Sequence, residues 1–398
     1  MRFPEFSGEW GKYKVSDVLD FYSTNSLSWD QLEYNSDELL NLHYGLIHVG
    51  LPTVVNLDEN VLPNIKKEFL PKNYELCREG DVAFADASED TNEVAKAIEF
   101  VNLSDKNVVC GLHTIHGRDN HNLTSIGFKG YSFASESFHN QIRRIAQGTK
   151  IFSISSKNFN ECYMGIPSKD EQTKIAKLLA LIDERISTQS RIIEELKLLR
   201  NTLMFKLFTP KDKWLKLSIG DVAHVIGGGT PDTNIEDYWN GNIQWFTPSE
   251  IGKEKYVTGS ERTLTQKGLD NSSAKLLPPN TILLSTRATI GECSIAKQEC
   301  CTNQGFQSLI ATTVTPEFLY YLIQTKRRDL LSKASGSTFA EISANEVRRI
   351  HICIPATATE QEIIVRPLSA YDEKIETEYK MLHLFKMQKQ YLLSHMFI

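Results

Sequence analysis

The chain has 398 residues, of which 41% are hydrophobic and 24% are charged. This composition is ordinary for a globular protein, and the length suits two or three domains better than one core. No apolar run approaches the roughly 18 residues that a membrane-spanning helix needs, and the N-terminus lacks the apolar core of a signal peptide. We therefore expect a cytoplasmic protein that does not contact a membrane.

The net charge of −6 is unevenly distributed along the chain. Residues 1–165 carry a net −8, whereas residues 166–213 carry a net +3. An acidic balance does not exclude nucleic-acid binding, because only the surface that faces the ligand has to be basic. It does predict weak binding by the chain alone and assistance from a partner.

In chain order, the sequence predicts a mixed globular segment at 1–165, a long helix within 166–213, a second mixed segment at 214–353 and a second long helix within 354–398. Each helix pattern extends over about 38 residues, or roughly 57 Å at 1.5 Å per residue. Helices of this length exceed the usual globular range and indicate coiled-coil pairing.

The two halves of the chain repeat each other. Alignment of Glu171 and Gln172 with Glu360 and Gln361 sets an offset of 189 residues. Both copies then show apolar positions at alternating steps of four and three, which is the seam of a heptad repeat. The matched seam positions are Ile175, Leu179, Ile182, Ile186, Ile193 and Leu196 in the first copy, and Ile364, Leu368, Tyr371, Ile375, Leu382 and Phe385 in the second.

The polar interruptions of the seam coincide as well, since Arg200 matches Lys389 and Gln189 matches Glu378. Two such helices in one chain can pair antiparallel with each other. Pro367 lies inside the second pattern, so the second helix is expected either to begin at this residue or to be kinked there.

Four stretches of the sequence resemble the specificity (S) subunit of type I restriction-modification systems. They are residues 2–10 (RFPEFSGEW), residues 227–231 with 237–248 (GGGTP and DYWNGNIQWFTP), residues 284–291 (LSTRATIG), and the Ile-Pro to Glu-Gln boundary that precedes each long helix. The resemblance covers essentially the whole chain, and the order and duplication of the motifs make it specific.

The resemblance implies an α/β (α+β) fold with two target-recognition domains, at 1–165 and 214–353, separated by two antiparallel spacer helices within 166–213 and 354–398. Each domain would read one half of a split site in double-stranded DNA. The helices would set the spacing and dock two methyltransferase (M) subunits, and restriction (R) subunits would complete the complex. S-adenosylmethionine would be bound by the methyltransferase, and ATP and Mg by the restriction subunit, with no cofactor in this chain.

The candidate base contacts are polar side chains of the types that bind base edges in DNA grooves. Arginine suits guanine, glutamine suits adenine, and serine or threonine suits either. The candidates are Thr230, Ser249, Arg287, Thr289, Gln304, Gln307, Ser337 and Thr338 in the second domain, and His113, Arg118, Thr149 and Lys150 in the first.

No motif predicts catalysis by this chain. Residues 227–230 are rich in glycine, but no lysine follows as a P-loop requires, and residues 277–280 have the wrong order for an adenine methyltransferase motif. The seven cysteines include no Cys-x-x-Cys pair, so buried free thiols are expected. His113, His116 and His121 lie close in sequence without an acidic or cysteine partner at ligand spacing, so we predict no metal site.

An alternative function stays open at this point. The long helices could form a coiled-coil scaffold for protein partners, with DNA contact only incidental. Sequence-selective DNA binding by the assembled complex distinguishes the two hypotheses.

Overall fold

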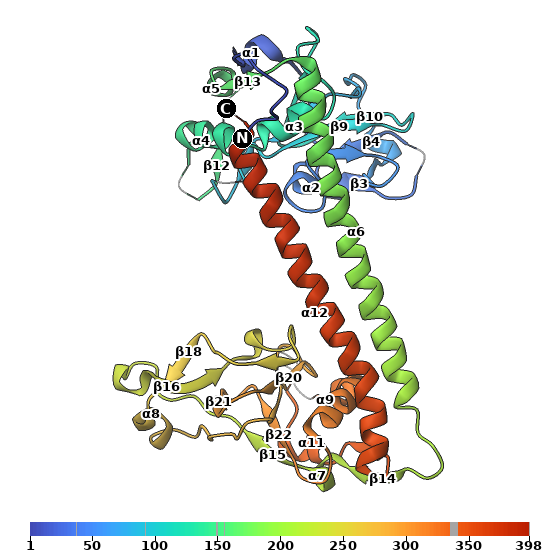
Figure 1. Cartoon of the computed structure of the whole chain (residues 1–398), viewed down its shortest axis with the longest axis vertical. Coiled ribbons are helices and arrows are strands. Elements are labelled where there is room, and N and C mark those ends of the chain that lie inside the picture. The colour runs from blue at the N-terminus through green and yellow to red at the C-terminus, as the bar shows by residue number, and fades with distance from the viewer. Residues whose placement is uncertain (37, 92, 149, 155, 335–340, 398) are drawn as a thin grey trace. The chain divides into compact units, whose positions relative to one another are not determined.

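The computed structural model of the chain describes residues 1–36, 38–91, 93–148, 150–154, 156–334 and 341–397 (Figure 1). Contacts group the chain into two compact units, each of which combines a globular segment with part of both long helices. Unit 1 contains residues 1–191 and 380–398, and unit 2 contains residues 192–379. The predicted domain boundaries therefore differ from the contact units, and they stay a prediction.

Unit 1 is built on a five-stranded sheet of order β2-β11-β7-β9-β5. Its strands are β2 (Asp20–Tyr22), β5 (Val54–Asn56), β7 (Val82–Ala85), β9 (Ala97–Asn102) and β11 (Thr114–Arg118). A second sheet has the order β10-β4-β6-β3, and its strands are β3 (Leu32–Glu33), β4 (Leu40–Leu42), β6 (Asn64–Ile65) and β10 (Val108–Cys110). Two short pairs join β1 (Gly11–Lys14) to β13 (Tyr163–Ile166) and β8 (Ala87–Ser88) to β12 (Phe152–Ser153). The helices are α1 (Val15–Val18), α2 (Tyr44–His48), α3 (Phe128–Phe133), α4 (Glu136–Ile145) and α5 (Ser156–Asn160).

Unit 2 repeats this plan. Its five-stranded sheet has the order β15-β22-β19-β20-β17, from β15 (Ala223–Gly227), β17 (Tyr256–Val257), β19 (Ile282–Leu284), β20 (Cys293–Ala296) and β22 (Gln307–Ala311). The second sheet contains β16 (Trp239–Phe246), β18 (Arg262–Leu264) and β21 (Cys300–Thr302), and a separate pair joins β14 (Leu215–Ser218) to β23 (His351–Ile354). The helices are α7 (Ile219–Val222), α8 (Gln266–Asp270), α9 (Pro316–Thr325), α10 (Arg327–Lys333) and α11 (Ala344–Arg348).

The strand directions of the two five-stranded sheets also agree. In both sheets the first three neighbouring pairs are antiparallel and the last pair is parallel. In both second sheets, one strand pairs parallel on one side and antiparallel on the other. The predicted mixed fold class and the internal repeat are therefore confirmed. Outside the long helices, the repeat is clear in the order and direction of the strands but not in the amino-acid sequence.

The two long helices are α6 (Lys169–Leu207) with 39 residues and α12 (Ala358–His395) with 38 residues. Helix α12 does not begin at Pro367, which lies inside it. An interior proline costs roughly 3 kcal/mol because it removes a backbone donor and crowds the preceding turn. The neighbouring Ile364 and Leu368 are buried in the core of unit 2, and this packing offsets the cost. No helix in the described ranges has both the length and the apolar character to cross a bilayer.

Each unit completes its core with segments of both long helices. In unit 1, Ile175, Leu179 and Ile182 of α6 pack in the same cluster as Leu392 of α12 and Met396, the residue that follows α12. In unit 2, Met204 of α6 and Phe208, the residue that follows α6, share a cluster with Ile364 and Leu368 of α12. Every one of the twelve predicted seam residues is buried or half-buried. The seam residues are therefore largely covered within the chain, and the prediction that they also contact a partner stays a prediction.

A glutamine anchors each globular segment to its long helix. Gln172 is buried and accepts a hydrogen bond from the backbone N–H of Ser125 at 2.7 Å. Its repeat equivalent Gln361 is also buried and accepts from the backbone N–H of Thr315 at 3.4 Å. The Glu-Gln pair of the sequence motif thus places one amide at the same structural contact in both units.

An ion pair between the long helices also occurs twice at equivalent positions. Lys389 lies 2.6 Å from Asp183 in unit 1, and Arg200 lies 3.0 Å from Asp372 in unit 2. Tyr131 donates its hydroxyl hydrogen to Asp183 at 2.8 Å. Burial, reinforced by Asp183, raises the pKa of Tyr131, so the hydroxyl remains a donor. These contacts fix the antiparallel register of the helices inside each unit.

We predict that Asp183→Asn lowers the stability of unit 1 by about 1–3 kcal/mol, between the usual values for surface and buried pairs. The substitution leaves Lys389 without its counter-ion while it preserves side-chain volume. Urea unfolding of the full chain measures the effect, and Glu184→Gln, at an exposed neighbouring position, is the matched control. Equal unfolding midpoints for the two variants would contradict the role of the pair.

Candidate nucleic-acid interface

Four loops of unit 2 converge at the end of its five-stranded sheet. Backbone hydrogen bonds join them: Gly229 donates to Thr302 at 2.8 Å, Asn303 to Phe246 at 3.1 Å, and Thr286 to Gly305 at 2.8 Å. Residues 227–230, 246–250, 285–291 and 302–307 therefore form one continuous surface, which we call the four-loop surface. A frame held by main-chain bonds can present different side chains without a change of fold.

The candidate base contacts of the second domain gather on this surface. Thr230, Ser249, Thr289 and Gln304 are exposed, and the Thr230 hydroxyl donates to the Gln304 side-chain oxygen. The Gln307 amide oxygen is buried and has no hydrogen-bond partner among the described residues. The structure thus brings together residues from distant parts of the sequence, but it does not test whether they contact bases. Ser337 and Thr338 lie outside the described residues.

Arg287 has a partner that the sequence did not indicate. Its guanidinium lies 2.9 Å from the carboxylate of Glu341, and both side chains are about two-fifths exposed, at 40% and 41%. A half-exposed pair of this kind can open at small cost, because water solvates both charges. Glu341 therefore neutralises Arg287 in the free chain, and a phosphate or guanine would have to displace it.

Glycine is required at Gly228 and Gly229 of the four-loop surface, since a Cβ atom on Gly229 would lie 2.4 Å from the backbone nitrogen of Ala274. A Cβ atom on Gly228 would lie 2.0 Å from the carbonyl oxygen of Asn303 and 2.4 Å from that of Thr302. Both obstacles are backbone atoms, which cannot move aside as a flexible side chain can. The indole N–H of the buried Trp245 donates to the Gly229 carbonyl at 2.9 Å and holds the same loop from below.

Unit 1 has the same frame at the equivalent place. Asp86 donates its backbone N–H to His113, and Ile154 donates to Asp86, each at 3.1 Å. In unit 2, Thr286 occupies the place of Asp86, since it donates to Gly305 and accepts from Ile342. His113 is exposed and its ring lies 3.1 Å from the Asp86 carboxylate.

The other candidates of the first domain are placed differently. Lys150 is exposed in the segment that precedes Ile154. Thr149 lies outside the described residues. Arg118 is buried in the interior of unit 1.

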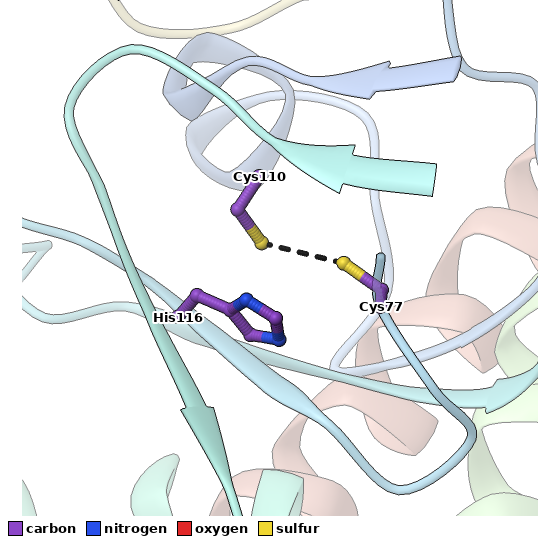
Figure 2. A group of neighbouring side chains, drawn as sticks. All are labelled: Cys77, Cys110 and His116. Carbon is purple, nitrogen blue, oxygen red and sulfur yellow. Dashed lines mark hydrogen bonds between the residues drawn. The ribbon is translucent and has the colours of Figure 1, made fainter. Parts of the chain in front are cut away.

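A buried cluster lies beneath the His113 loop. Cys77, Cys110 and His116 place their ligand atoms within 4.8 Å of one another, and all three side chains are buried (Figure 2). The two sulfur atoms are 3.6 Å apart. His116 Nε2 lies 2.7 Å from the carboxylate of Asp81.

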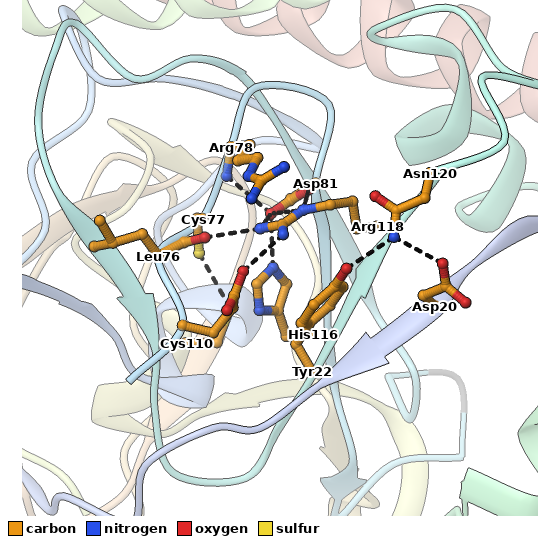
Figure 3. Close-up of polar contacts among 11 residues, drawn as sticks. Asp20, Tyr22, Leu76, Cys77, Arg78, Asp81, Cys110, His116, Arg118 and Asn120 are labelled. Carbon is orange, nitrogen blue, oxygen red and sulfur yellow. Dashed lines mark hydrogen bonds and ion pairs between the residues drawn. The ribbon is translucent and has the colours of Figure 1, made fainter. Parts of the chain in front are cut away.

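Arg118 is part of the same interior network and not of a DNA-facing surface (Figure 3). Its guanidinium donates to Asp81 at 2.8 and 2.9 Å, to Glu75 at 2.7 Å and to the Leu76 carbonyl at 2.7 Å. It also stacks over the Tyr22 ring at 4.4 Å. Burial opposes the charge, but the hydrogen bonds to Asp81 and Glu75 outweigh it and raise the pKa of Arg118. We therefore correct the prediction that Arg118 contacts a base. An arginine suits guanine by its residue type, but the residue type does not show that this side chain is buried.

The other cysteines agree with the expectation of buried free thiols, except that Cys353 is only half-buried. Cys162, Cys293, Cys300 and Cys301 are buried and free. Burial raises the pKa of Cys301 to about 11, so this thiol stays neutral and unreactive beneath the four-loop surface. No cysteine in the described part of the chain is oxidised.

Solved structures show the class of fold to which this arrangement belongs. The chain superimposes on the S subunit of a type I restriction-modification system from M. genitalium with a TM-score of 0.56 and 16% identity, over 100% of this chain and 99% of that one. A chain from a structural study of assembly and conformational transition in the type I R-M system matches with a TM-score of 0.63 and 17% identity, over 98% and 97%. The fold is that of a two-domain specificity subunit.

Sequence comparison finds relatives of the same kind. Residues 211–383 match the type I restriction modification DNA specificity domain. The MjaIX specificity subunit of Methanocaldococcus jannaschii is 37% identical over 194 residues, 48% of this chain and 44% of the relative. The EcoR124I/EcoR124II specificity subunit of Escherichia coli is 26% identical over 54% of this chain and 57% of the relative. The chain thus spans about half the length of these relatives, and over the matched regions it is similar to type I restriction enzyme specificity subunits.

We predict that Gly228→Ala disrupts the four-loop surface and costs about 1–3 kcal/mol, because the added methyl group overlaps two carbonyl oxygens. Gly227→Ala is the matched control, since a Cβ there meets only the Gln307 side chain at 3.6 Å. Thermal unfolding and limited proteolysis of both variants measure the difference. If Gly228→Ala were as stable and as resistant as Gly227→Ala, the proposed fit of this loop would be refuted.

Proposed function

We propose that this chain is the DNA-recognition subunit of a type I restriction-modification complex and has no catalytic activity of its own. Each unit would read one half of a bipartite site in double-stranded DNA. The observation that carries the proposal is the duplicated backbone frame, which presents a variable loop surface once in each unit. A duplicated frame with different side chains suits two readers of two different half-sites.

The partners follow from the same proposal. Two methyltransferase (M) subunits would bind the long helices and would use S-adenosylmethionine to methylate adenine. Restriction (R) subunits would bind ATP and Mg, and the complex would act on DNA in the cytoplasm. The long helices would also set the spacing between the half-sites.

Exposed apolar side chains on the long helices support docking of a protein partner. Monomeric proteins seldom expose many large apolar residues along one element. The exposed set is Leu181, Leu198, Leu199, Phe205, Ile363, Tyr379, Met381, Leu384, Met387 and Tyr391. Leu198 and Met387 are equivalent positions of the repeat and are 68% and 54% exposed.

The proposal is tested by co-expression of the chain with the methyltransferase encoded beside it, followed by genome-wide mapping of N6-methyladenine. One split motif that appears only when this chain is present supports the proposal. The scaffold alternative predicts an assembled complex without new sequence-selective methylation, and that result would replace the proposal.

We predict that Arg287→Ala changes or weakens recognition of one half-site only. A lost bidentate contact to guanine costs about 1–3 kcal/mol of discrimination at one position, and the half-site read by unit 1 keeps its sequence. Methylation mapping of the variant complex measures both halves at once. Arg328→Ala, at an exposed arginine of α10, is the control and should leave the motif unchanged. An unaltered motif for Arg287→Ala would remove this residue from the reading surface.

We further predict that Leu198→Gln and Met387→Gln each weaken the binding of one methyltransferase copy. Loss of a buried apolar contact costs about 1–3 kcal/mol at an interface, or roughly 10- to 100-fold in affinity. Mass analysis of the purified complex should show one methyltransferase per chain for each single variant and none for the double variant. Leu331→Gln, at an equally exposed leucine of α10, controls for a general effect of the substitution. Two methyltransferases retained by the double variant would move the docking surface elsewhere.

A further inference from the structure

The buried cluster in unit 1 joins Cys77 to two consecutive strands that lie more than 30 residues later in the sequence. Cys77 follows the isolated bridge between Leu76 and Val109, Cys110 ends β10, and His116 lies in the middle of β11. Their exposed fractions are 6%, 1% and 0%. Burial of an imidazole beside two thiols costs more desolvation free energy than burial of apolar residues of similar volume. The cluster is therefore expected to have a function beyond packing.

One ring nitrogen of His116 provides an independent observation. Nδ1 is buried and has no hydrogen-bond partner among the described residues. Nε2 faces Asp81, whose carboxylate also accepts hydrogen bonds from Arg118 and therefore remains ionised. The carboxylate can only accept, so Nε2 carries a hydrogen, and in the neutral ring the Nδ1 lone pair is then free for another ligand. Figure 2 shows the ring beside the two sulfur atoms, with one nitrogen turned toward them.

We propose that Cys77, Cys110 and His116 Nδ1 bind a zinc ion, with Asp81 as the hydrogen-bond acceptor that orients the imidazole. Zinc takes thiolate and imidazole ligands at about 2.3 and 2.0 Å in a tetrahedron, which places two sulfur ligands about 3.8 Å apart. The observed sulfur–sulfur distance of 3.6 Å is close to this tetrahedral edge. A disulfide bond would require about 2.05 Å. A histidine that binds zinc commonly donates its other ring N–H to a carboxylate, as His116 does here.

The charges of the site also suit zinc. Two thiolates and a neutral imidazole give a net charge of zero with Zn²⁺, which lowers the cost of burial. On binding, each thiol releases its proton to solvent as its sulfur forms a bond to the metal, and no electron is transferred. A fourth ligand from solvent completes the tetrahedron.

The site would stabilise one particular loop. Residues 111–115 connect two of the proposed ligands and carry the exposed His113. A metal bound by Cys110 and His116 would close this loop at both ends and tie it to Cys77. Because the assignment rests on the cluster alone, it does not depend on what His113 contacts.

The first experiment measures zinc in the full chain, purified without an affinity step on immobilised metal. We expect about one zinc per chain by elemental analysis, and a thiolate-to-metal absorption band when the metal-free chain is titrated with cobalt(II). Alkylation of the native chain, read peptide by peptide, locates the site: zinc should slow modification of Cys77 and Cys110 at least 10-fold relative to the metal-free chain. Cys162, a buried thiol of the same unit, should show no change with metal.

Variants test the ligands individually. Cys110→Ser and His116→Gln should lose the bound zinc, whereas Cys162→Ser should retain it. If the ligand variants fail to fold, the cobalt titration and the alkylation pattern of the unmodified chain still decide. A fully reduced chain that contains no zinc and gives no cobalt–thiolate band would overturn the proposal, and so would a Cys77–Cys110 disulfide in the natively purified protein.

Discussion

The structure depends on burial of each globular core against helix segments from distant parts of the chain. Unit 1 cannot cover Ile175, Leu179 and Ile182 without Leu392 at the end of α12 and Met396 just after it. Unit 2 has the same requirement for the first part of α12, through Ile364 and Leu368. Apolar burial at roughly 25 cal/mol per Å² is the main stabilising term, so neither unit has a complete core until both helices are in place.

Polar contacts then give this burial a defined register. The pairs of Asp183 with Lys389 and of Asp372 with Arg200 occupy equivalent positions of the repeat and are mostly removed from water. A shift of one helix by one residue along the other would bury an uncompensated charge in both units. The free-energy cost of that charge exceeds any gain in apolar contact. The helices can therefore carry many exposed apolar residues on other faces, for a partner, without losing their own alignment.

In the globular segments, too, the two units share a backbone arrangement but carry different side chains. Main-chain hydrogen bonds join equivalent loops in the two units, through Thr286 in one and Asp86 in the other. Main-chain groups are common to all residues, so this frame restricts the sequence little except at Gly228 and Gly229, where backbone atoms leave no space for a side chain. Recognition surfaces can diverge on such a frame, and the divergence explains why the repeat is faint outside the helices.

The sequence by itself determined the mixed fold class, the repeat and the two long helices, because heptad spacing and helix length depend on near neighbours in the chain. It also selected residues of the four-loop surface, such as Thr230 and Gln304, whose loop motifs are local. Only the tertiary structure decided that Arg118 is buried with Asp81, that Glu341 pairs with Arg287, and that Cys77 and Cys110 meet His116. Except for Cys110 and His116, those contacts join residues more than 30 positions apart, and residue type alone does not show which side chains become neighbours once the sheets have formed.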